Sequence, residues 1–145
     1  MDSLKNIVEI LSKETKIQLC VVHLLDITNC LDINKFVGSL LVSLSAMIHI
    51  ELPFINVLTK ADLLSNEMLE DLDFIEEGLD YNKIATKCEN SNIPEKLKKL
   101  LLKICEKVEE YGLVYYEILN IKEIVSMNNL QNVIERGNGF EFNQK

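Results

Sequence analysis

The sequence predicts an α/β protein with a three-layer parallel sheet, and three observations support this class. Short apolar runs alternate with longer segments whose apolar residues recur at helical spacing. The 145 residues include only two prolines and five glycines, with 48% hydrophobic and 26% charged residues, which is typical of one folded domain. Strands joined through helices form right-handed crossovers, which make them parallel. We therefore expect a single domain over residues 1–145.

The first elements are a helix, a strand and a long helix. An amphipathic helix opens the chain, with Asp2 or Ser3 as its cap. The run Ile17–Asp26 is apolar enough for a parallel strand buried on both faces. Asp32 can cap the long helix that follows. The expected apolar face of that helix comprises Phe36, Val37, Leu40, Leu41, Leu44, Met47 and Ile48.

The middle of the chain predicts a second strand and a short acidic helix. Pro53 precedes the strand Phe54–Leu58, at a position where its missing N–H is tolerated. Ser65 or Asn66 can cap the helix, which we expect to run through Leu72. Residues 67–80 contain seven acidic residues and no basic one. A solvated face is the favoured interpretation of this run, and a docking surface for a basic partner is the alternative.

The last third predicts a helix, a strand and a closing helix. The first of these begins after Pro94 and ends at Gly112. The run Leu113–Leu119 is the third strand. Ser126 is expected to cap the closing helix and Gly137 to end it. Its inward residues are expected to be Met127, Leu130, Val133 and Ile134.

Composition excludes several classes of function. The net charge of −8 repels phosphate backbones, so we expect no direct nucleic acid binding. No run approaches the roughly 18 uninterrupted apolar residues of a membrane span. Wide cysteine spacing argues against a zinc site and favours core thiols in a reducing compartment, in cytoplasm or nucleus. These cysteines are Cys20, Cys30, Cys88 and Cys105, and the lone histidines, His23 and His49, are expected to be structural.

Polar residues follow each predicted strand, at the edge where parallel sheets bind ligands. They are Asp26, the turn from Thr59 to Asp62, and the Leu119-Asn120 turn. A lysine and an aspartate spaced as Lys60 and Asp62 suit guanine, because the carboxylate can accept both the ring N–H and the exocyclic amine. Adenine lacks that pair of donors, and each unmet polar group costs roughly 1–3 kcal/mol. From spacing alone, an exposed turn before a helix is the better supported interpretation, and the placement after a buried strand makes the two equally supported.

A resemblance to a known family favours the guanine interpretation. The segment "CVVHLLDITNCLDINKFVGSLLVSLSAMIHIELPFINVLTKADLL" resembles the part of the GPN-loop GTPases that ends in their guanine-specificity motif. "YGLVYYEILNI" and "VIERGNGFEF" are similar to the family's last core strand and closing helix. His23 to Asp26, Cys30 and Asn138-Gly139 are most like the second eukaryotic paralogue, while "SLSAMI" is more like the third.

The resemblance implies roles for individual residues. The guanine-binding set would be Thr59, Lys60, Asp62, Leu119 and Asn120. Thr59 occupies a position where other GTPases often have asparagine. Glu117-Ile118 departs from the family's usual apolar-Pro pair, which bears on the geometry of the adjacent turn. Asp26 matches a strand-terminal aspartate, with capping of the next turn and a nucleotide-side role as equal alternatives.

The resemblance also implies a partial P-loop NTPase domain of the SIMIBI class. Residues 1–145 would be the C-terminal part of a GPN-loop GTPase G domain that lacks the N-terminal P-loop half. No Gly-x-x-x-x-Gly-Lys-Ser/Thr motif occurs in the sequence, nor the Gly-Pro-Asn insertion. We therefore expect GTP or GDP as the ligand, Mg²⁺ only together with the P-loop half, no catalytic residues, and no hydrolysis by this chain alone.

Two biological interpretations follow from the resemblance. The favoured one is a piece of a GPN-loop GTPase, which would form a homo- or heterodimer and assist assembly or nuclear import of RNA polymerase II. Such a protein would be cytoplasmic, with movement to the nucleus. The alternative is a non-catalytic interaction module derived from that fold, which would use the acidic stretch or an exposed apolar face.

Overall fold

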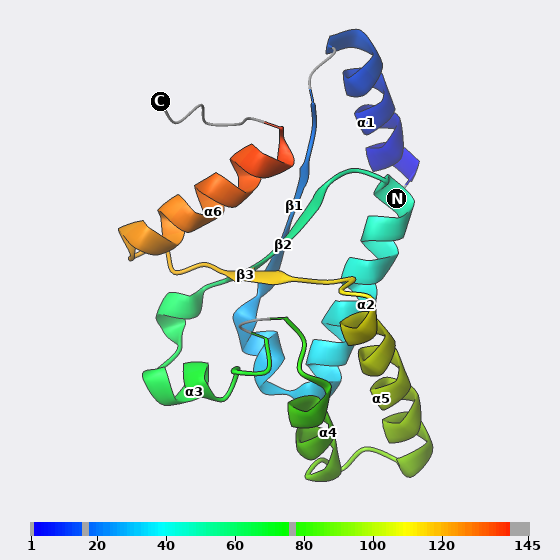
Figure 1. The fold of residues 1–145 in the computed structure, drawn as a ribbon, viewed down its shortest axis with the longest axis vertical. Coiled ribbons are helices and arrows are strands. Elements are labelled where there is room, and N and C mark those ends of the chain that lie inside the picture. Colours follow the sequence, from blue (N-terminus) through cyan, green and yellow to red (C-terminus); the bar gives the residue numbers. More distant parts are fainter. Residues whose placement is uncertain (1, 16–17, 76–77, 140–145) are drawn as a thin grey trace.

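The structure is a computed structural model, and it describes residues 2–15, 18–75 and 78–139. The elements of Figure 1 are α1 (Asp2–Thr15), β1 (Val21–Asp26), η1 (Ile27–Leu31), α2 (Ile33–Ile50), β2 (Phe54–Thr59), η2 (Ala61–Leu63), α3 (Asn66–Glu70), α4 (Tyr81–Glu89), α5 (Glu95–Glu110), β3 (Tyr116–Ile118) and α6 (Ile124–Gly137). The predicted side-chain cap at Asp2, the strand start at Ile17 and the end of "VIERGNGFEF" lie outside what the structure describes.

The three strands form a parallel sheet in the order β1-β2-β3, as the sequence predicts. Register pairs Val21 with Phe54 and Asp26 with Thr59, so β1 and β2 end side by side. On the other side of β2, Leu58 pairs with Ile118. The carboxyl ends of all three strands therefore meet at one edge of the sheet.

Helices cover both faces of the sheet, which gives the predicted three layers. Side chains along β2 alternate between the faces. Leu58 lies in the larger hydrophobic cluster, with Phe36 of α2 and Leu101 of α5, whereas Ile55 and Val57 pack against α6. In Figure 1, α2, α4 and α5 group on one side of the sheet and α6 lies on the other.

Aromatic rings fix α2 against the sheet. The Phe36 ring is fully buried and meets Phe74 edge-to-face, with 5.1 Å between ring centroids. Tyr116 of β3 lies 6.3 Å from Phe36 on the same measure. These three side chains link α2, the segment after α3 and the sheet into one core.

Two of the predicted helix caps are confirmed. The Asp32 carboxylate accepts hydrogen bonds from the backbone N–H groups of Asn34 and Lys35, at 2.8 and 3.3 Å. Ser65 Oγ accepts one from Met68 N–H, at 3.3 Å. The acidic helix ends at Glu70 rather than Leu72.

Other details differ from the sequence prediction. Strands β1 and β3 are shorter than the predicted runs Ile17–Asp26 and Leu113–Leu119. Within these runs only Val21–Asp26 and Tyr116–Ile118 are strands. The sequence reasoning did not place α4, whose cap is Asp80. Leu41 and Ile48 of α2 and Met127 of α6 are exposed rather than inward. The buried face of each helix is therefore narrower than the face that its apolar residues predict.

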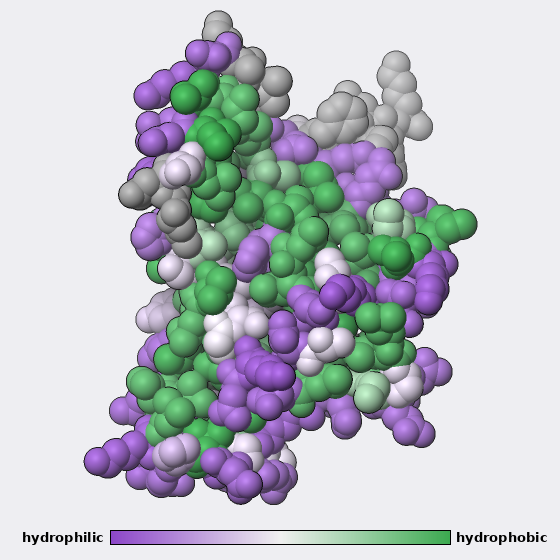
Figure 2. Space-filling model, turned by 180° about the vertical axis from the view of Figure 1, so that it is seen from behind, coloured by the Kyte–Doolittle hydropathy of each residue, from purple (hydrophilic) through white to green (hydrophobic). Residues whose placement is uncertain are grey.

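One apolar face of the molecule is uncovered. Within the described residues β1 pairs only with β2, and its Val22 and Leu24 are 37% and 61% exposed. The apolar residues of α1, Leu4, Ile7, Ile10 and Leu11, are also exposed. Figure 2 shows the resulting hydrophobic surface, which extends from the α1 region across the middle of this face. Such a continuous apolar patch marks an interaction surface.

Helix α2 is predominantly apolar over its 18 residues. By length and composition alone it could cross a membrane, a test that the core helix of a soluble protein also passes. Phe36, Val37 and Leu40 are at most 1% exposed and belong to the larger hydrophobic cluster. This burial identifies the inner face of α2 as part of the protein core.

Replacing Phe36 by alanine should lower the free energy of unfolding by about 3–5 kcal/mol, because it removes a buried ring and leaves a cavity. Urea denaturation would measure the change as a lower midpoint at unchanged slope. Leu41→Ala on the exposed side of the same helix is the matched control, with an expected change within about 0.5 kcal/mol. Equal effects of the two substitutions would contradict the described packing of α2.

Candidate functional site

The residues predicted to bind a ligand lie at the carboxyl-terminal edge of the sheet, and backbone hydrogen bonds hold its two turns together. Asp26 and Thr59 end neighbouring strands in register, and Leu119 directly follows β3. Leu119 N–H donates to the Leu58 carbonyl at 2.8 Å, and Ala61 N–H donates to the Leu119 carbonyl at 3.2 Å. The Thr59–Asp62 turn and the Leu119-Asn120 turn are therefore in direct contact.

The first turn gives Thr59 and Lys60 different roles. Thr59 Oγ1 donates to the Leu25 carbonyl at 3.0 Å, so this hydroxyl ties β2 to β1. Lys60 follows with a left-handed backbone, at φ 67° and ψ 27°, an uncommon conformation outside glycine. This conformation starts the short η2 helix, which carries Asp62 in its first turn.

Lys60 pairs with Asp26 across the strand ends. Its Nζ lies 2.6 Å from Asp26 Oδ2. The other oxygen, Oδ1, accepts hydrogen bonds from Thr28 Oγ1 and Thr28 N–H, at 2.7 and 3.0 Å. The hydrogen bond from Lys60 and those from Thr28 lower the pKa of Asp26 from 3.8 to about 2. Asp26 thus caps the following turn and also faces the predicted site.

Asp62 is the least exposed charged group of the site. Its side chain is 11% exposed, and Oδ2 lies 3.1 Å from Nζ of Lys122, which is 70% exposed. A carboxylate so far removed from water needs hydrogen-bond donors. The structure therefore brings Lys60 and Asp62 to one edge, each paired with a different charged residue.

The second turn is held by the side chains of Asn120 and Ser126, in roles that the sequence analysis did not assign to them. Asn120 N–H donates to Ser126 Oγ at 2.9 Å, and Ser126 Oγ donates to the Ile118 carbonyl at 3.2 Å. Asn120 Oδ1 accepts from Lys122 N–H at 3.0 Å, and Asn120 Nδ2 donates to Glu123 at 2.9 Å. The Asn120 side chain thus shapes the turn locally.

The prediction of Ser126 as a helix cap is wrong. Helix α6 begins at Ile124, with Glu123 at the cap position, three residues before Ser126. Ser126 instead braces the turn that precedes the helix. The local signal for this turn is Asn120 itself, since asparagine accepts a hydrogen bond from the N–H two residues later in many turns.

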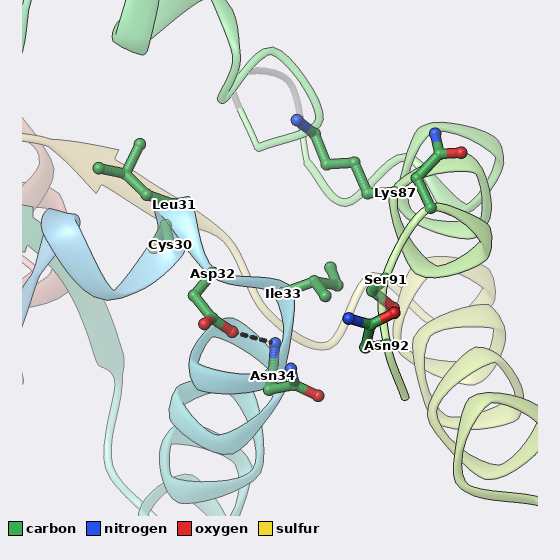
Figure 3. A pocket seen from close by; sticks show the side chains of 9 residues that line it. Cys30, Leu31, Asp32, Ile33, Asn34, Lys87, Ser91 and Asn92 are labelled. Carbon is green, nitrogen blue, oxygen red and sulfur yellow. Dashed lines mark hydrogen bonds between the residues drawn. The ribbon is translucent and has the colours of Figure 1, made fainter. Parts of the chain in front are cut away.

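A separate hollow lies between the start of α2 and the connection from α4 to α5. It has a volume of about 420 Å³ and contains none of the predicted base-reading residues. Figure 3 shows Asp32 at its wall, where the carboxylate accepts a hydrogen bond from Asn34 N–H. Lys87 and the polar residues Asn90, Ser91 and Asn92 form the opposite wall.

The structure gives Cys30, Cys105 and His23 structural environments. Burial raises the pKa of Cys30 to about 12 and that of Cys105 to about 11, which makes both thiols poor nucleophiles. His23 Nδ1 lies 3.2 Å from Asn56 Oδ1, at the face of the sheet that α2 covers. Among the described residues no group of three His, Cys, Asp or Glu side chains is placed to hold a metal ion.

Comparison with known proteins gives consistent matches over almost the whole chain. A family model described as "conserved hypothetical ATP binding protein" matches residues 1–140. GPN-loop GTPase QQT1 of Arabidopsis thaliana is 35% identical over 143 residues, and GPN-loop GTPase 2 of Saccharomyces cerevisiae is 37% identical over 145. Each alignment covers 97% of this chain, but 48% and 42% of the respective relative.

GPN-loop GTPase 2 of Danio rerio is similar to the same extent, at 35% identity over 143 residues, with 97% of this chain and 46% of the relative covered. The chain therefore spans about half the length of the curated relatives it matches. The resemblance to the second eukaryotic paralogue is confirmed. No solved structure matches the chain.

Asp26→Asn should destabilise the protein by up to about 1 kcal/mol at neutral pH, the range of exposed ion pairs. The folded pKa of about 2 lies below the ordinary 3.8, so the charged form stabilises the fold above pH 4. This contribution is lost as the pH falls towards 2, and the difference from wild type should shrink accordingly. Urea denaturation at pH 7, 4 and 2.5 measures it.

Asp73→Asn is the matched control for this pH series. It also removes a carboxylate from a lysine pair, with Asp73 Oδ2 2.8 Å from Lys83 Nζ and the side chains 49% and 44% exposed. We expect a smaller effect, because both side chains are well solvated. A destabilisation by Asp26→Asn that is the same at all three pH values would contradict the assigned role of the charge.

Proposed function

The chain belongs to the family of conserved hypothetical ATP-binding proteins and is related to the GPN-loop GTPases, and from this premise we propose that its sheet edge is the guanine-recognition half of a GTP-binding site. Asp62 is the base-reading residue, and Lys60 lies along the base. The observation that carries the proposal is the Asp62 carboxylate, 11% exposed at the end of a buried strand and 3.1 Å from an ammonium donor.

The chemistry of the two bases favours guanine over adenine. Guanine presents its ring N–H and exocyclic amine side by side, which matches the two oxygens of a carboxylate. Adenine presents a ring nitrogen lone pair at the corresponding position, and this lone pair would face the negative charge of Asp62. The site therefore fits the word GTPase in the relatives' names better than the word ATP in the family description.

The turns around Asp62 give the carboxylate a fixed position. The Ala61 N–H bond to Leu119 and the Thr59 hydroxyl bond to Leu25 connect the base-reading loop to both neighbouring strands. A bidentate contact depends on such positioning, because its selectivity is lost when the acceptor can rotate away. Leu119 and Asn120 border the base in this proposal, and Asp26 orients Lys60.

Phosphate and Mg²⁺ binding require a second half of the site, which we propose lies against the free edge of β1. A phosphate-binding loop needs glycines, a lysine and a hydroxyl at fixed spacing, and this sequence lacks that motif. The uncovered Val22 and Leu24 support such a contact, because another parallel strand and its helix would bury them. Alone, the chain is proposed to bind guanine without hydrolysing GTP.

The cellular role is proposed from the family resemblance alone. By that resemblance the protein acts as a homo- or heterodimer in the assembly or nuclear import of RNA polymerase II. It would work in the cytoplasm and move to the nucleus. Copurification of polymerase subunits with the tagged chain, and loss of that association in Leu24→Asp but not Leu41→Asp, would test this role.

A non-catalytic interaction module is the second candidate function, and the uncovered apolar surface favours it. In that case the partner would bury Val22, Leu24 and the α1 side chains, and the ligand edge would stay empty. Four acidic residues of the 67–80 run, Glu67, Glu70, Asp71 and Asp73, are solvent-exposed, which both a solvated face and a docking surface require. A stable dimer that binds neither GDP nor ADP would support this candidate.

GDP should bind the chain at least about tenfold more tightly than ADP, because adenine leaves the carboxylate of Asp62 without its donors. Titration followed by backbone amide resonances measures both affinities and locates the shifts, which we expect at residues 59–62 and 119–122. Asp62→Ala should abolish the preference, whereas the control Asp73→Ala should retain it. Equal binding of GDP and ADP would refute guanine recognition.

Asp62→Asn should change the preferred base from guanine to xanthine. Xanthine has a carbonyl where guanine has its exocyclic amine, so it presents one donor and one acceptor to the protein. An asparagine amide offers the complementary oxygen and NH₂ group. The same titration with GDP and XDP measures the reversal. Retention of the GDP preference in this variant would show that Asp62 does not contact the base.

A further inference from the structure

Both charged residues of the proposed base-reading pair already have internal partners. Lys60 Nζ lies 2.6 Å from Asp26 Oδ2, and Lys122 Nζ lies 3.1 Å from Asp62 Oδ2. Lys122 belongs to neither the Thr59–Asp62 turn nor the Leu119-Asn120 pair. Its contact with Asp62 arises only because the two turns meet at the edge of the sheet.

The backbone of Lys122 is positioned by the turn that contains it. Asn120 Oδ1 accepts a hydrogen bond from Lys122 N–H at 3.0 Å, and Ser126 Oγ holds Asn120 N–H at 2.9 Å. The side chain is 70% exposed, and the contact of its ammonium group with Asp62 is what holds it. The backbone of Lys122 is thus held by its turn, while its ammonium group can leave Asp62 for water.

The ammonium group and a guanine base would compete for the same carboxylate. An ammonium is a compact point charge, which satisfies one oxygen of Asp62 from the solvent side. The two N–H donors of guanine need both oxygens in a fixed geometry. Because Asp62 is 11% exposed, its carboxylate has little room for both donors together.

We propose that Lys122 is a specificity-determining counter-ion of Asp62, which occupies the carboxylate in the empty site and is displaced by guanine. This inference rests on the proposed function. A base that offers two N–H donors replaces what Asp62 loses when Lys122 leaves. Adenine cannot do so, and Lys122 therefore keeps the carboxylate closed to it.

Guanosine is the appropriate probe, because it is neutral and carries no phosphate. Removal of a lysine charge therefore does not change its affinity through long-range attraction. Lys122→Met removes the competitor but keeps an unbranched side chain. We expect guanosine to bind this variant about two- to fivefold more tightly, which corresponds to the strength of an exposed ion pair. Lys122→Arg should retain the wild-type affinity.

Lys107→Met is the matched control, since it removes a lysine that pairs with Glu110 on α5, away from the site. It should leave guanosine affinity unchanged. Weaker binding by Lys122→Met would mean that Lys122 contacts the base, and unchanged binding would mean that it does not compete. Either result overturns the inference about Lys122. The proposed function would still stand in both cases, provided that the wild-type protein binds guanosine.

Acylation of Lys122, measured by mass spectrometry, gives a second readout. Guanosine should increase the labelling of Lys122 in wild type, because displacement frees the amine, and adenosine should not. Asp62→Asn should increase it without any ligand, which tests the ion pair independently of nucleotide binding. Reduced labelling with guanosine, or no effect of Asp62→Asn, would overturn the inference. Wild type that binds no guanosine would overturn the proposed function, and with it this role.

Discussion

The parallel register of β2 between β1 and β3 is the constraint on which the rest of the structure depends. It places Asp26 beside Thr59 and lets Leu119 exchange backbone hydrogen bonds with Leu58 and Ala61. β2 is buried on both faces, and a slip of one residue would exchange the side chains that pack in the larger cluster with those that pack against α6. The position of Asp62 therefore follows from packing in the core rather than from contacts within its own loop.

Several features could be predicted from the sequence because their causes are local. An apolar run between polar turns predicts β2, and an aspartate or serine before a helix predicts the caps Asp32 and Ser65. The Lys60 and Asp62 motif could also be predicted, because its two residues are close in sequence. Helix α4 was not predicted, because only Ile84 and Cys88 of its nine residues are buried. Two buried residues give a weak helical periodicity.

Contacts between distant segments could not be predicted in this way. The pairs Lys60–Asp26 and Lys122–Asp62 join residues 34 and 60 positions apart, and no local pattern specifies which ammonium meets which carboxylate. Ser126 was assigned a local role as a cap, but it serves the turn before its helix. Likewise the apolar pattern of α2 could not tell that Leu41 faces away from the core, because that depends on where the sheet lies.

The two ion pairs bear on how such a site can combine selectivity with reversible binding. An unpaired carboxylate that is largely removed from water would destabilise the empty protein, whereas one held by Lys122 does not. In the proposed site, base binding is an exchange of hydrogen-bond donors on Asp62, and the gain in free energy is the difference between two sets of hydrogen bonds. Such an exchange yields selectivity between bases but only modest affinity. Tight binding must therefore come from contacts to the phosphates, which is the contribution expected of the half of the site that would lie against β1.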